Sequence, residues 1–518
     1  MLEKIKTTVD EKLLKKSYLY TFILGLAAHG YCFLNLMVSH DSLNDFYVSD
    51  QWERANFGRI FYSIYISLTR GRIVLPWLIG VFALCWISLA VYFVAKMFNI
   101  QKSGILLLVS GIFVTNPTVY ALAATYIHDL DADMFAMLLS VIAVYLWKNA
   151  NSKRELQKKT VGLVISGFVL SIALGIYQSY ISLVITLIIL YSIKELLEKS
   201  SFKKVIVDGC CGIGVLMIAA IFYLIELKVF EILTGVSAMN SETYNGLGNM
   251  SQVFSGNVLG NILNTYLSFI NAFKNTILTS YPESISLVVL GILAIVIVMI
   301  ALYGLKKMEW KNRGLFVVLS AILPFGMNLT YFLSGGVGHV LTQYAVWMLY
   351  LLALVLILWM AKEDTLNCQV KKVFYILAAG CLILTIGENI QTSNSIYVKK
   401  DLEYQATLSY MTRVADKMEE QEEYVPGETQ VMFIGEDAVG NSKYGFERYE
   451  IITGVSAEGS VTYYDTYKDY FKYILARPIS ICYDEELKNS DEVLEMPVFP
   501  KQGSVQMIDG VMVVKLAE

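Results

Sequence analysis

Acids and arginines concentrate in a short stretch that follows the first long apolar run of the chain. Between His40 and Arg72 there are four acids, four arginines and no lysine. The acids are Asp41, Asp45, Asp50 and Glu53, and the arginines are Arg54, Arg59, Arg70 and Arg72. A positioned carboxylate can take a proton from a hydroxyl group, and the planar guanidinium suits a phosphate better than an ammonium does. The stretch therefore offers a candidate general base and a candidate phosphate site.

The first two of these acids, Asp41 and Asp45, are four residues apart, so a helix would place them on one face. They come at the end of the apolar run, where charge beside a membrane is costly and usually has a use. Trp52 and other aromatic residues lie among the arginines, and residues 52–69 have the pattern of an amphipathic helix in the headgroup layer. The alternative is that the arginines contact only lipid phosphates and that the acids are their ion-pair partners.

A second group of acids opens a later apolar run. Asp129 and Asp133 are again four residues apart, with Asp131 between them and His128 in front. Asp129 or Asp131 could be a helix N-cap, since acids are favoured there, whereas Asp133 enters the apolar run. The spacing matches no specific metal motif, so we expect no metal site and no cofactor, with a divalent metal as the alternative.

Other candidate positions lie further along the chain or within the first apolar run. Tyr177 and Gln178 interrupt a double-length apolar stretch, where they could recognise a sugar or be ordinary interface residues. His339 follows a glycine-rich segment and is a candidate for phosphate or sugar contact, but no nucleotide-binding strand precedes it. His29 lies within the first apolar run, where we expect a packed polar side chain.

The composition indicates a membrane protein. Of the 518 residues, 56% are hydrophobic and 17% are charged, whereas a soluble domain is about half apolar and about a quarter charged. A spanning helix needs roughly 20 mostly apolar residues, and by that criterion we predict about eleven helices. They are expected near residues 18–38, 74–97, 103–122, 132–147, 161–177, 180–194, 205–225, 285–305, 314–333, 340–361 and 373–393. The first run is too long for a cleavable signal peptide.

Lysines determine the expected orientation, because cytoplasmic loops are enriched in Lys and Arg. The lysine groups fall on one side of the membrane if residues 161–194 form two helices with a hairpin at 177–180. The N-terminus is then cytoplasmic. The first loop, 39–73, and the segment after 394 are then extracytoplasmic.

The C-terminal segment differs in charge from the rest. Residues 396–518 carry 12 Lys and Arg against 23 Asp and Glu, a net charge of −11, whereas the remainder carries +7. We predict a transmembrane domain over 1–395 and a small soluble α/β domain over 396–518. Its expected elements are a helical connector at 401–423, a break at 425–427, a strand at 430–435, a helix at 461–475 and a hairpin at 504–515 that turns at Asp509-Gly510.

Taken together, these features resemble a known family, the Gtr type II serotype-converting bacterial membrane glucosyltransferases of the GT-C superfamily. The residues that carry the resemblance are Asp41, Asp45, Trp52, Gly58-Arg59, Asp133, Tyr177-Gln178 and, near the end, Pro497-Val498-Phe499-Pro500, Gly503 and Val513-Val514-Lys515. Each motif is short, and their order and the topology carry most of the weight. The resemblance covers nearly the whole chain.

The resemblance implies a GT-C-like fold and a hexosyltransferase. Such an enzyme takes a sugar, expected to be glucose, from a polyprenyl-phosphate donor and transfers it with inversion to a cell-surface polysaccharide such as an O-antigen. The reaction would take place on the outer face of the bacterial cytoplasmic membrane, surrounded by membrane lipid. A flippase and a donor-making glycosyltransferase are implied as partners, and nucleic acid is not.

The resemblance also implies roles for particular residues. Asp41 is the first candidate for the general base and Asp45 the second, and which of them acts stays open. Arg59 is the first candidate for the donor phosphate. Further phosphate candidates are Arg54, Arg70, Arg72 and His339. Candidates for sugar or acceptor contact are His40, Trp52, Asp129, Asp133, Tyr177 and Gln178.

Two other classes of protein fit a polytopic chain. A lipid-linked sugar flippase or transporter should have charges near the bilayer midplane and broken helices in both halves, whereas here the charges crowd on one side. A non-catalytic assembly protein of envelope polysaccharide synthesis would tolerate the loss of Asp41 and Asp45.

Overall fold

The protein is described by a computed structural model, and the residues that the structure describes are 10–37, 39–48, 52–238, 257–435, 446–452, 455 and 466–517. Asp50 lies outside the described residues, as does the first part of the helix predicted at 461–475. The side chains of His40 and Glu53 also lie outside them.

The chain divides into two compact units. The helical unit comprises Met1–Leu34, Val48–Ala123 and Asp129–Asn394, and the C-terminal unit comprises Asn35–Tyr47, Ala124–His128 and Ser395–Glu518. Two short segments from the first third of the chain thus belong with the C-terminal residues. That residues 396–518 form a separate extracytoplasmic domain stays a prediction.

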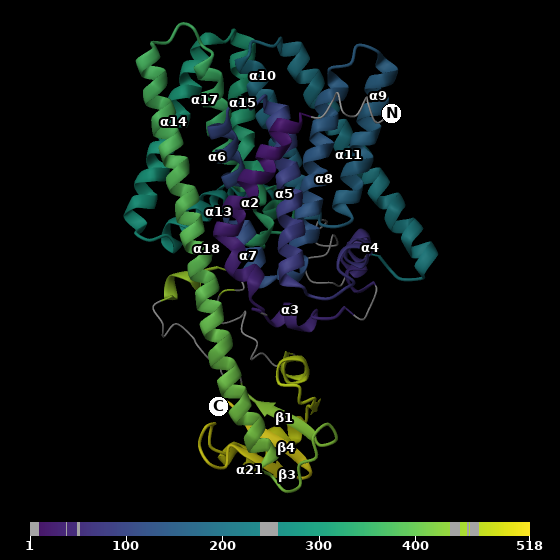
Figure 1. Cartoon of the computed structure of the whole chain (residues 1–518). Helices are drawn as coiled ribbons and strands as arrows, with labels where there is room; N and C mark the ends of the chain where they lie inside the picture. Colours follow the sequence, from purple (N-terminus) through teal and green to yellow (C-terminus); the bar gives the residue numbers. More distant parts are fainter. Residues whose placement is uncertain are drawn as a thin grey trace. The chain divides into compact units, whose positions relative to one another are not determined.

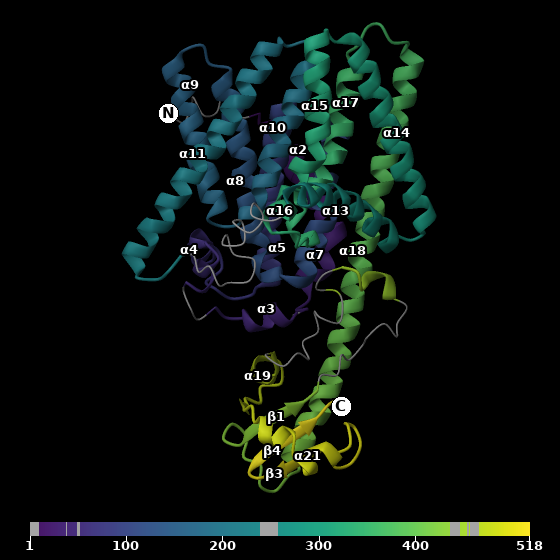
Figure 2. The same cartoon turned by 180° about the vertical axis from the view of Figure 1, so that it is seen from behind.

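Among the described residues, nine helices are long and apolar enough to cross a membrane. They are α2 (Glu11–Leu34), α5 (Pro76–Phe98), α8 (Ile127–Asn151), α9 (Leu156–Leu174), Gln178–Leu197 with η2 (Gln178–Tyr180) and α10 (Ile181–Leu197), α11 (Phe202–Thr234), α14 (Glu283–Lys307), Tyr344–Ala361 with η4 (Tyr344–Met348) and α17 (Leu349–Ala361), and α18 (Cys368–Glu419). A tenth is counted if α6 (Ser103–Val114) and α7 (Pro117–Thr125), bent by 40°, are one span. Most of these helices run side by side (Figures 1 and 2). The predicted polytopic helical class is confirmed.

The described part of the chain has nine candidate spans, or ten with the bent pair, against the predicted number of about eleven. The segment expected at 314–333 is α15 (Trp310–Met327) followed by α16 (Leu329–Leu333), and α15 is not among the candidate spans. It begins with the polar run Lys311-Asn312-Arg313 and ends at Asn328, so its apolar part is short. By contrast, the stretch 161–194 is two helices, as predicted. Outside the candidate spans lie α13 (Val258–Thr279) and η3 (Val340–Thr342).

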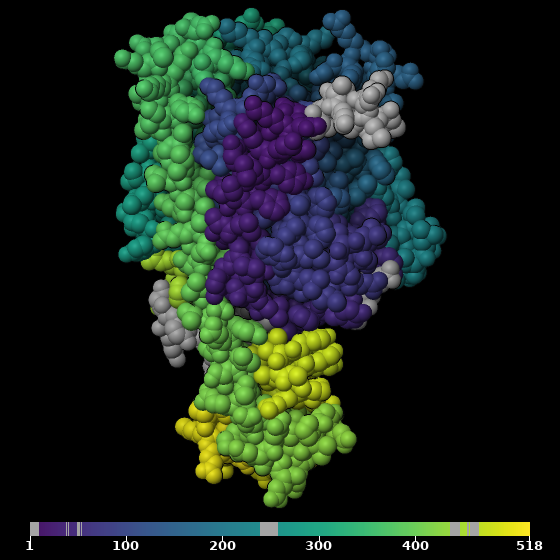
Figure 3. Space-filling view, in the orientation of Figure 1, coloured from purple at the N-terminus to yellow at the C-terminus, as the bar shows by residue number. Residues whose placement is uncertain are grey.

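Small residues allow the first helix to pack closely in the bundle. A side chain at Gly25 of α2 would overlap Leu84 of α5, and one at Gly80 of α5 would overlap Phe33 of α2. Ser393 Oγ of α18 donates to the Ala28 carbonyl of α2 at 3.0 Å, and α2 and α18 lie side by side in Figure 3. Close approach of this kind is typical of membrane helices.

The predicted amphipathic helix over 52–69 is broken in the structure. It consists of η1 (Glu53–Asn56) and α4 (Ile60–Thr69), separated by a turn at 57–59. Gly58 has φ +73°, a conformation that favours glycine and that a helix cannot contain. The break turns Arg59 away from the helical register that the sequence pattern predicted.

The C-terminal unit contains a four-stranded mixed sheet in the order β2-β1-β4-β3. The strands are β1 (Gln430–Ile434), β2 (Ser480–Ile481), β3 (Val505–Ile508) and β4 (Val511–Lys515). β1 is parallel to β2 and β4, and β3 and β4 form the predicted antiparallel hairpin. Asp509 and Gly510 turn it with φ of 50° and 78°, as a tight hairpin turn requires.

The predicted connector at 401–423 is the last part of α18, which packs Met411, Val414 and Met418 against Val431 and Phe433 of β1. The short elements of this unit are α3 (His40–Asn44), η5 (Glu447–Tyr449), α19 (Tyr467–Asp469), η8 (Tyr470–Ile474), α20 (Glu485–Lys488) and α21 (Asp491–Glu495).

Candidate functional site

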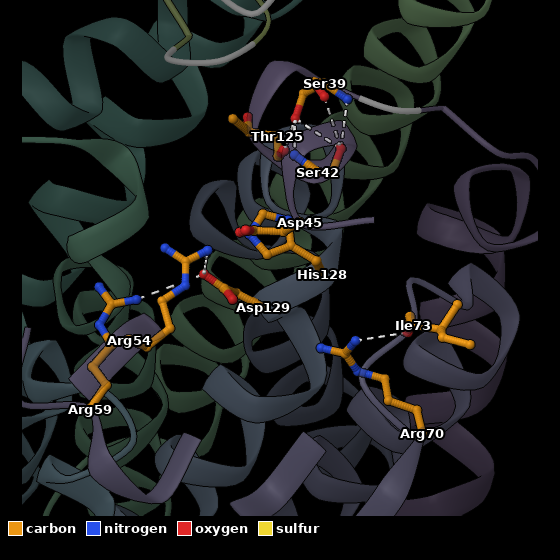
Figure 4. Close-up of polar contacts among 10 residues, drawn as sticks. All are labelled: Ser39, Ser42, Asp45, Arg54, Arg59, Arg70, Ile73, Thr125, His128 and Asp129. Atoms are coloured by element: carbon orange, nitrogen blue, oxygen red, sulfur yellow. Dashed lines mark hydrogen bonds and ion pairs between the residues drawn. The ribbon is translucent and has the colours of Figure 1, made fainter. Parts of the chain in front are cut away.

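Two arginines of the broken segment share one carboxylate at the start of α8. Arg54 Nη2 and Arg59 Nη1 lie 3.9 Å and 3.7 Å from Asp129 Oδ2 (Figure 4). The Asp129 side chain is 8% exposed, whereas those of Arg54 and Arg59 are 19% and 21% exposed. With Asp133, these residues form what we call the arginine–aspartate cluster. Two guanidinium groups thus face the Asp129 carboxylate near solvent, and the Asp133 carboxylate lies one helical turn further along α8.

Arg59 keeps hydrogen-bond donors for a ligand. Its contact with Asp129 is longer than a hydrogen bond, and its other contact is the Tyr177 ring, whose centroid lies 4.5 Å from the guanidinium carbon. Its Nε is buried and has no hydrogen-bond partner among the described residues. A guanidinium that is held by a carboxylate and a ring but not saturated can bind an incoming phosphate.

Three side-chain contacts hold the turn before Arg59. Gln178 Nε2 donates to the Phe57 carbonyl at 2.8 Å, and the Tyr223 hydroxyl donates to the Gly58 carbonyl at 3.0 Å. Gln178 Nε2 also lies 3.0 Å from that hydroxyl. The structure therefore places Gln178, a predicted sugar or acceptor contact, on the backbone that positions Arg59.

The remaining two arginines of the loop have different surroundings. The Arg70 side chain is 1% exposed, its Nε lies 3.4 Å from Asp131 Oδ1, and its Nη1 donates to the Ile73 carbonyl at 2.9 Å (Figure 4). Burial alone would lower the pKa of Arg70, but Asp131 and other neighbours raise it above its ordinary value, so the guanidinium stays charged. Arg72 donates from Nε to Ser67 Oγ at 3.1 Å. These contacts favour a structural role for Arg70.

Two tyrosines of α4 contact the same acids. Burial and the Asp129 carboxylate raise the pKa of Tyr62, and burial and Asp131 raise that of Tyr65. Each hydroxyl is therefore neutral beside its acid. Asp131, which the sequence treated as a possible cap, is fully buried between Arg70 and Tyr65.

Asp133 lies one turn after Asp129 and is 3% exposed. Among the described residues nothing forms an ion pair or hydrogen bond with its carboxylate, although Arg59 and Arg54 act on it electrostatically. Burial and the Asp133 charge raise the pKa of Tyr177 to about 12. An ionisable group held in this way is a functional candidate by default.

Further predicted residues lie apart from these contacts. Trp52 packs edge-on against Phe230 at 4.9 Å between ring centroids. The His339 carbonyl accepts from the backbone N and the Oγ1 of Thr342, each at 3.0 Å. His29 is buried with Nε2 at 2.7 Å from the Val114 carbonyl, which confirms the expected packed polar side chain.

The C-terminal unit contains a second polar group, the serine–histidine cluster of Ser39, Ser42, Asp45, Thr125 and His128 (Figure 4). His128 Nε2 lies 3.1 Å from Asp45 Oδ2, and both side chains are buried. Ser39 and Ser42 form a capping box at the start of α3, and Ser39 Oγ also donates to the Thr125 carbonyl. Asp41 is in the first turn of α3 and is half-buried.

α3 is anchored by Leu43, which is fully buried among the core residues of this unit. Asp45 is the C-cap of α3, and its backbone N donates to the Asp41 carbonyl at 2.9 Å. Asp41 and Asp45 are therefore one helical turn apart, and they differ in burial. The described part of the chain contains no group of three or more His, Cys, Asp or Glu with the geometry of a metal site.

The sequence reasoning missed Tyr62, Tyr65 and Tyr223 as members of this site, and it named Asp131 only as a possible helix cap or metal ligand. Tyr62 and Tyr65 are three residues apart in an apolar helix beside arginines, and that spacing could have indicated a shared polar face. No local signal points to Tyr223, because it lies 165 residues from the Gly58 carbonyl that it contacts.

The fold and these clusters define a polytopic membrane protein with a buried arginine–aspartate site at one helix start. The family described as Glucosyl transferase GtrII matches residues 30–385, well over half of the chain, and the protein belongs to that family. It is a membrane glucosyltransferase by this membership, and the matched region includes both clusters. The C-terminal motifs at 497–515 lie outside the match. No curated protein and no solved structure matches the chain.

Proposed function

We propose that this glucosyltransferase takes glucose from a polyprenyl-phosphate donor on the extracytoplasmic face of a bacterial cytoplasmic membrane. The acceptor is a cell-surface polysaccharide of the O-antigen kind. The observation that carries the donor proposal is Arg59, a partly exposed guanidinium with unsaturated donors beside a second arginine.

The donor requires cations, because negative charge builds up on the phosphate as it leaves. Preorganised cations at that position stabilise the transition state. Arg59 and Arg54 are the members of the loop that combine partial exposure with a shared carboxylate. Arg70 supports the site from within through Asp131, and Arg72 lies on Ser67.

The acceptor requires a base. In a single displacement the acceptor oxygen attacks the anomeric carbon and gives its proton to a carboxylate, while the bond to phosphate breaks and its electron pair leaves with the lipid phosphate. The anomeric centre inverts. Asp41 and Asp45 are our first candidates, and the contact with His128 would orient the Asp45 carboxylate. Such a base contributes about 10²–10⁴-fold.

The test uses purified protein in liposomes with an O-antigen acceptor. Polyprenyl-phosphate-glucose is offered to one sample and a nucleotide-linked glucose to another, and the product is analysed by NMR. We expect transfer from the lipid donor only, with an anomeric configuration opposite to that of the donor. Transfer from the nucleotide sugar, or retention of configuration, would overturn the proposal.

One observation also fits a lipid-linked sugar flippase. Among the described residues one pair of apolar helices, α6–α7, is bent at a short break, and a broken span is a transporter feature. In the same liposomes a flippase would move the glucosylated lipid between leaflets without consuming it. Movement without transfer to the acceptor would favour this second function.

A further inference from the structure

Two buried polar side chains, one in the arginine–aspartate cluster and one near it, form no hydrogen bond or ion pair with the described residues. Asp133 is 3% exposed and Tyr180 is 2% exposed. The Asp133 carboxylate has no ion pair or hydrogen bond among the described residues, and the Tyr180 hydroxyl is buried without a hydrogen-bond partner there. Unsatisfied buried polar groups are destabilising. A ligand that satisfied both would offset that cost.

The two groups share one neighbourhood. The Asp133 charge acts on the hydroxyl groups of both Tyr177 and Tyr180. The Tyr177 and Tyr180 rings are 5.8 Å apart in an edge-on arrangement, and Tyr177 also lies against the Arg59 guanidinium at 4.5 Å. Both unsatisfied groups are therefore adjacent to the ring that contacts the candidate phosphate-binding arginine.

Other tyrosines near Tyr180 do have hydrogen-bond partners for their hydroxyl groups. The Tyr344 ring lies 5.7 Å from that of Tyr180, and its hydroxyl donates to the Phe113 carbonyl at 2.7 Å. The Tyr223 hydroxyl donates to Gly58. Among the described residues, the neighbouring phenols thus have hydrogen-bond partners, whereas the Tyr180 hydroxyl and the Asp133 carboxylate have none.

We propose that Asp133 and Tyr180 form the subsite for the hydroxyl groups of the transferred hexose and determine which hexose is accepted. This inference rests on the proposed function. A carboxylate accepts strong hydrogen bonds from sugar hydroxyls, and a phenol can donate or accept one. The phosphate attached to the same sugar would lie at Arg59, next to Tyr177.

Such a subsite discriminates strongly. A site that hydrogen-bonds a substrate hydroxyl rejects an analogue without it, because the buried protein group is then left unpaired. An apolar pocket of the same shape would discriminate weakly. If ordered water were permanently hydrogen-bonded to Asp133 and Tyr180, no sugar hydroxyl could bind there, and the discrimination between hexoses would also be lost.

The experiment measures kcat/KM for polyprenyl-phosphate-glucose and for its 2-, 3-, 4- and 6-deoxy analogues. The variants are Tyr180→Phe, Asp133→Asn and the control Tyr344→Phe, whose lost hydroxyl is bonded to Phe113. We expect wild type to use at least one deoxy donor about 10²-fold or more less well than glucose. In Tyr180→Phe, kcat/KM for the glucose donor should fall, whereas kcat/KM for that deoxy donor should be unchanged. The ratio of the two kcat/KM values should therefore approach one. Tyr344→Phe should keep the wild-type ratio.

A second measurement covers the folding of the variants. Because the Tyr180 hydroxyl has no hydrogen-bond partner in the described part of the chain, Tyr180→Phe should have a Tm equal to or above that of wild type without donor. Wild type should gain more Tm from polyprenyl-phosphate-glucose than from polyprenyl phosphate, and Tyr180→Phe should lose that extra gain. If wild type, Tyr180→Phe and Asp133→Asn had the same kcat/KM ratio between glucose and deoxy donors and the same extra rise in Tm, the subsite would be overturned and the proposed donor would stand. No transfer and no gain in wild type would overturn the proposed donor and the subsite with it.

Discussion

Replacing Gly58 by alanine should lower both stability and activity, and Gly71 in the same loop provides a matched control. Gly58 and Gly71 have nearly the same backbone angle, with φ of +73° and +70°. A side chain at Gly58 would overlap the Tyr223 hydroxyl, whereas one at Gly71 would meet nothing within 4 Å. The two substitutions therefore share the backbone strain and differ in the contacts with Tyr223 and Gln178, which only the side chain at position 58 would make.

The expected losses of stability and of kcat/KM follow from the backbone strain and from the overlap with Tyr223. A non-glycine residue in the left-handed region costs about 1–2 kcal/mol, and both variants should lose about that much stability. Gly58→Ala should lose about 1 kcal/mol more, because the Tyr223 hydroxyl must move away from the Gly58 carbonyl. Displacing Arg59 by about 1 Å should reduce kcat/KM by about 10²-fold. Gly71→Ala should keep most of its kcat/KM.

The assay is glucose transfer from the lipid donor, with thermal unfolding in detergent as the stability measurement. Equal kcat/KM losses in Gly58→Ala and Gly71→Ala would refute the reasoning that Tyr223 positions Arg59 through this turn.

Three further predictions concern the acids and arginines. At least one of Asp41→Asn and Asp45→Asn should reduce kcat by about 10²-fold or more with normal membrane insertion; full activity in both would remove the base from α3. Arg59→Lys keeps the charge but loses the planar fork, so the KM for the lipid donor should rise; an unchanged KM would place the phosphate elsewhere. Asp131→Asn removes the carboxylate charge beside the buried Arg70 guanidinium and should destabilise the protein by about 3–5 kcal/mol, and an unchanged unfolding midpoint would contradict the buried ion pair.

Patterns of neighbouring residues correctly predicted those elements that depend only on the sequence within a few positions. Apolar length placed most spans, the polar interruption at 177–180 separated α9 from α10, and Asp509-Gly510 marked the hairpin turn. Each of these depends on residues within a few positions of one another. The same reasoning failed at Gly58, where an apparently continuous amphipathic pattern hides a left-handed turn.

The site contacts depend on helix packing instead. Asp129 approaches Arg59 only because the start of α8 packs beside the loop, and Gly58 meets Tyr223 across 165 residues. Charge and spacing could indicate which residues are chemically capable. They could not separate Arg70, which the fold buries against Asp131, from Arg59, whose donors stay unsaturated.

The most direct test of the central claim is a single-turnover measurement of radiolabelled glucose transfer from polyprenyl-phosphate-glucose to the acceptor in proteoliposomes. Wild type is compared with Arg59→Ala and with Arg72→Ala, a loop arginine that contacts Ser67. We predict rapid transfer by wild type and Arg72→Ala, and a rate lower by about 10²-fold or more in Arg59→Ala, as when a preorganised transition-state donor is removed. Equal rates in the three proteins, or no transfer by wild type, would contradict the account.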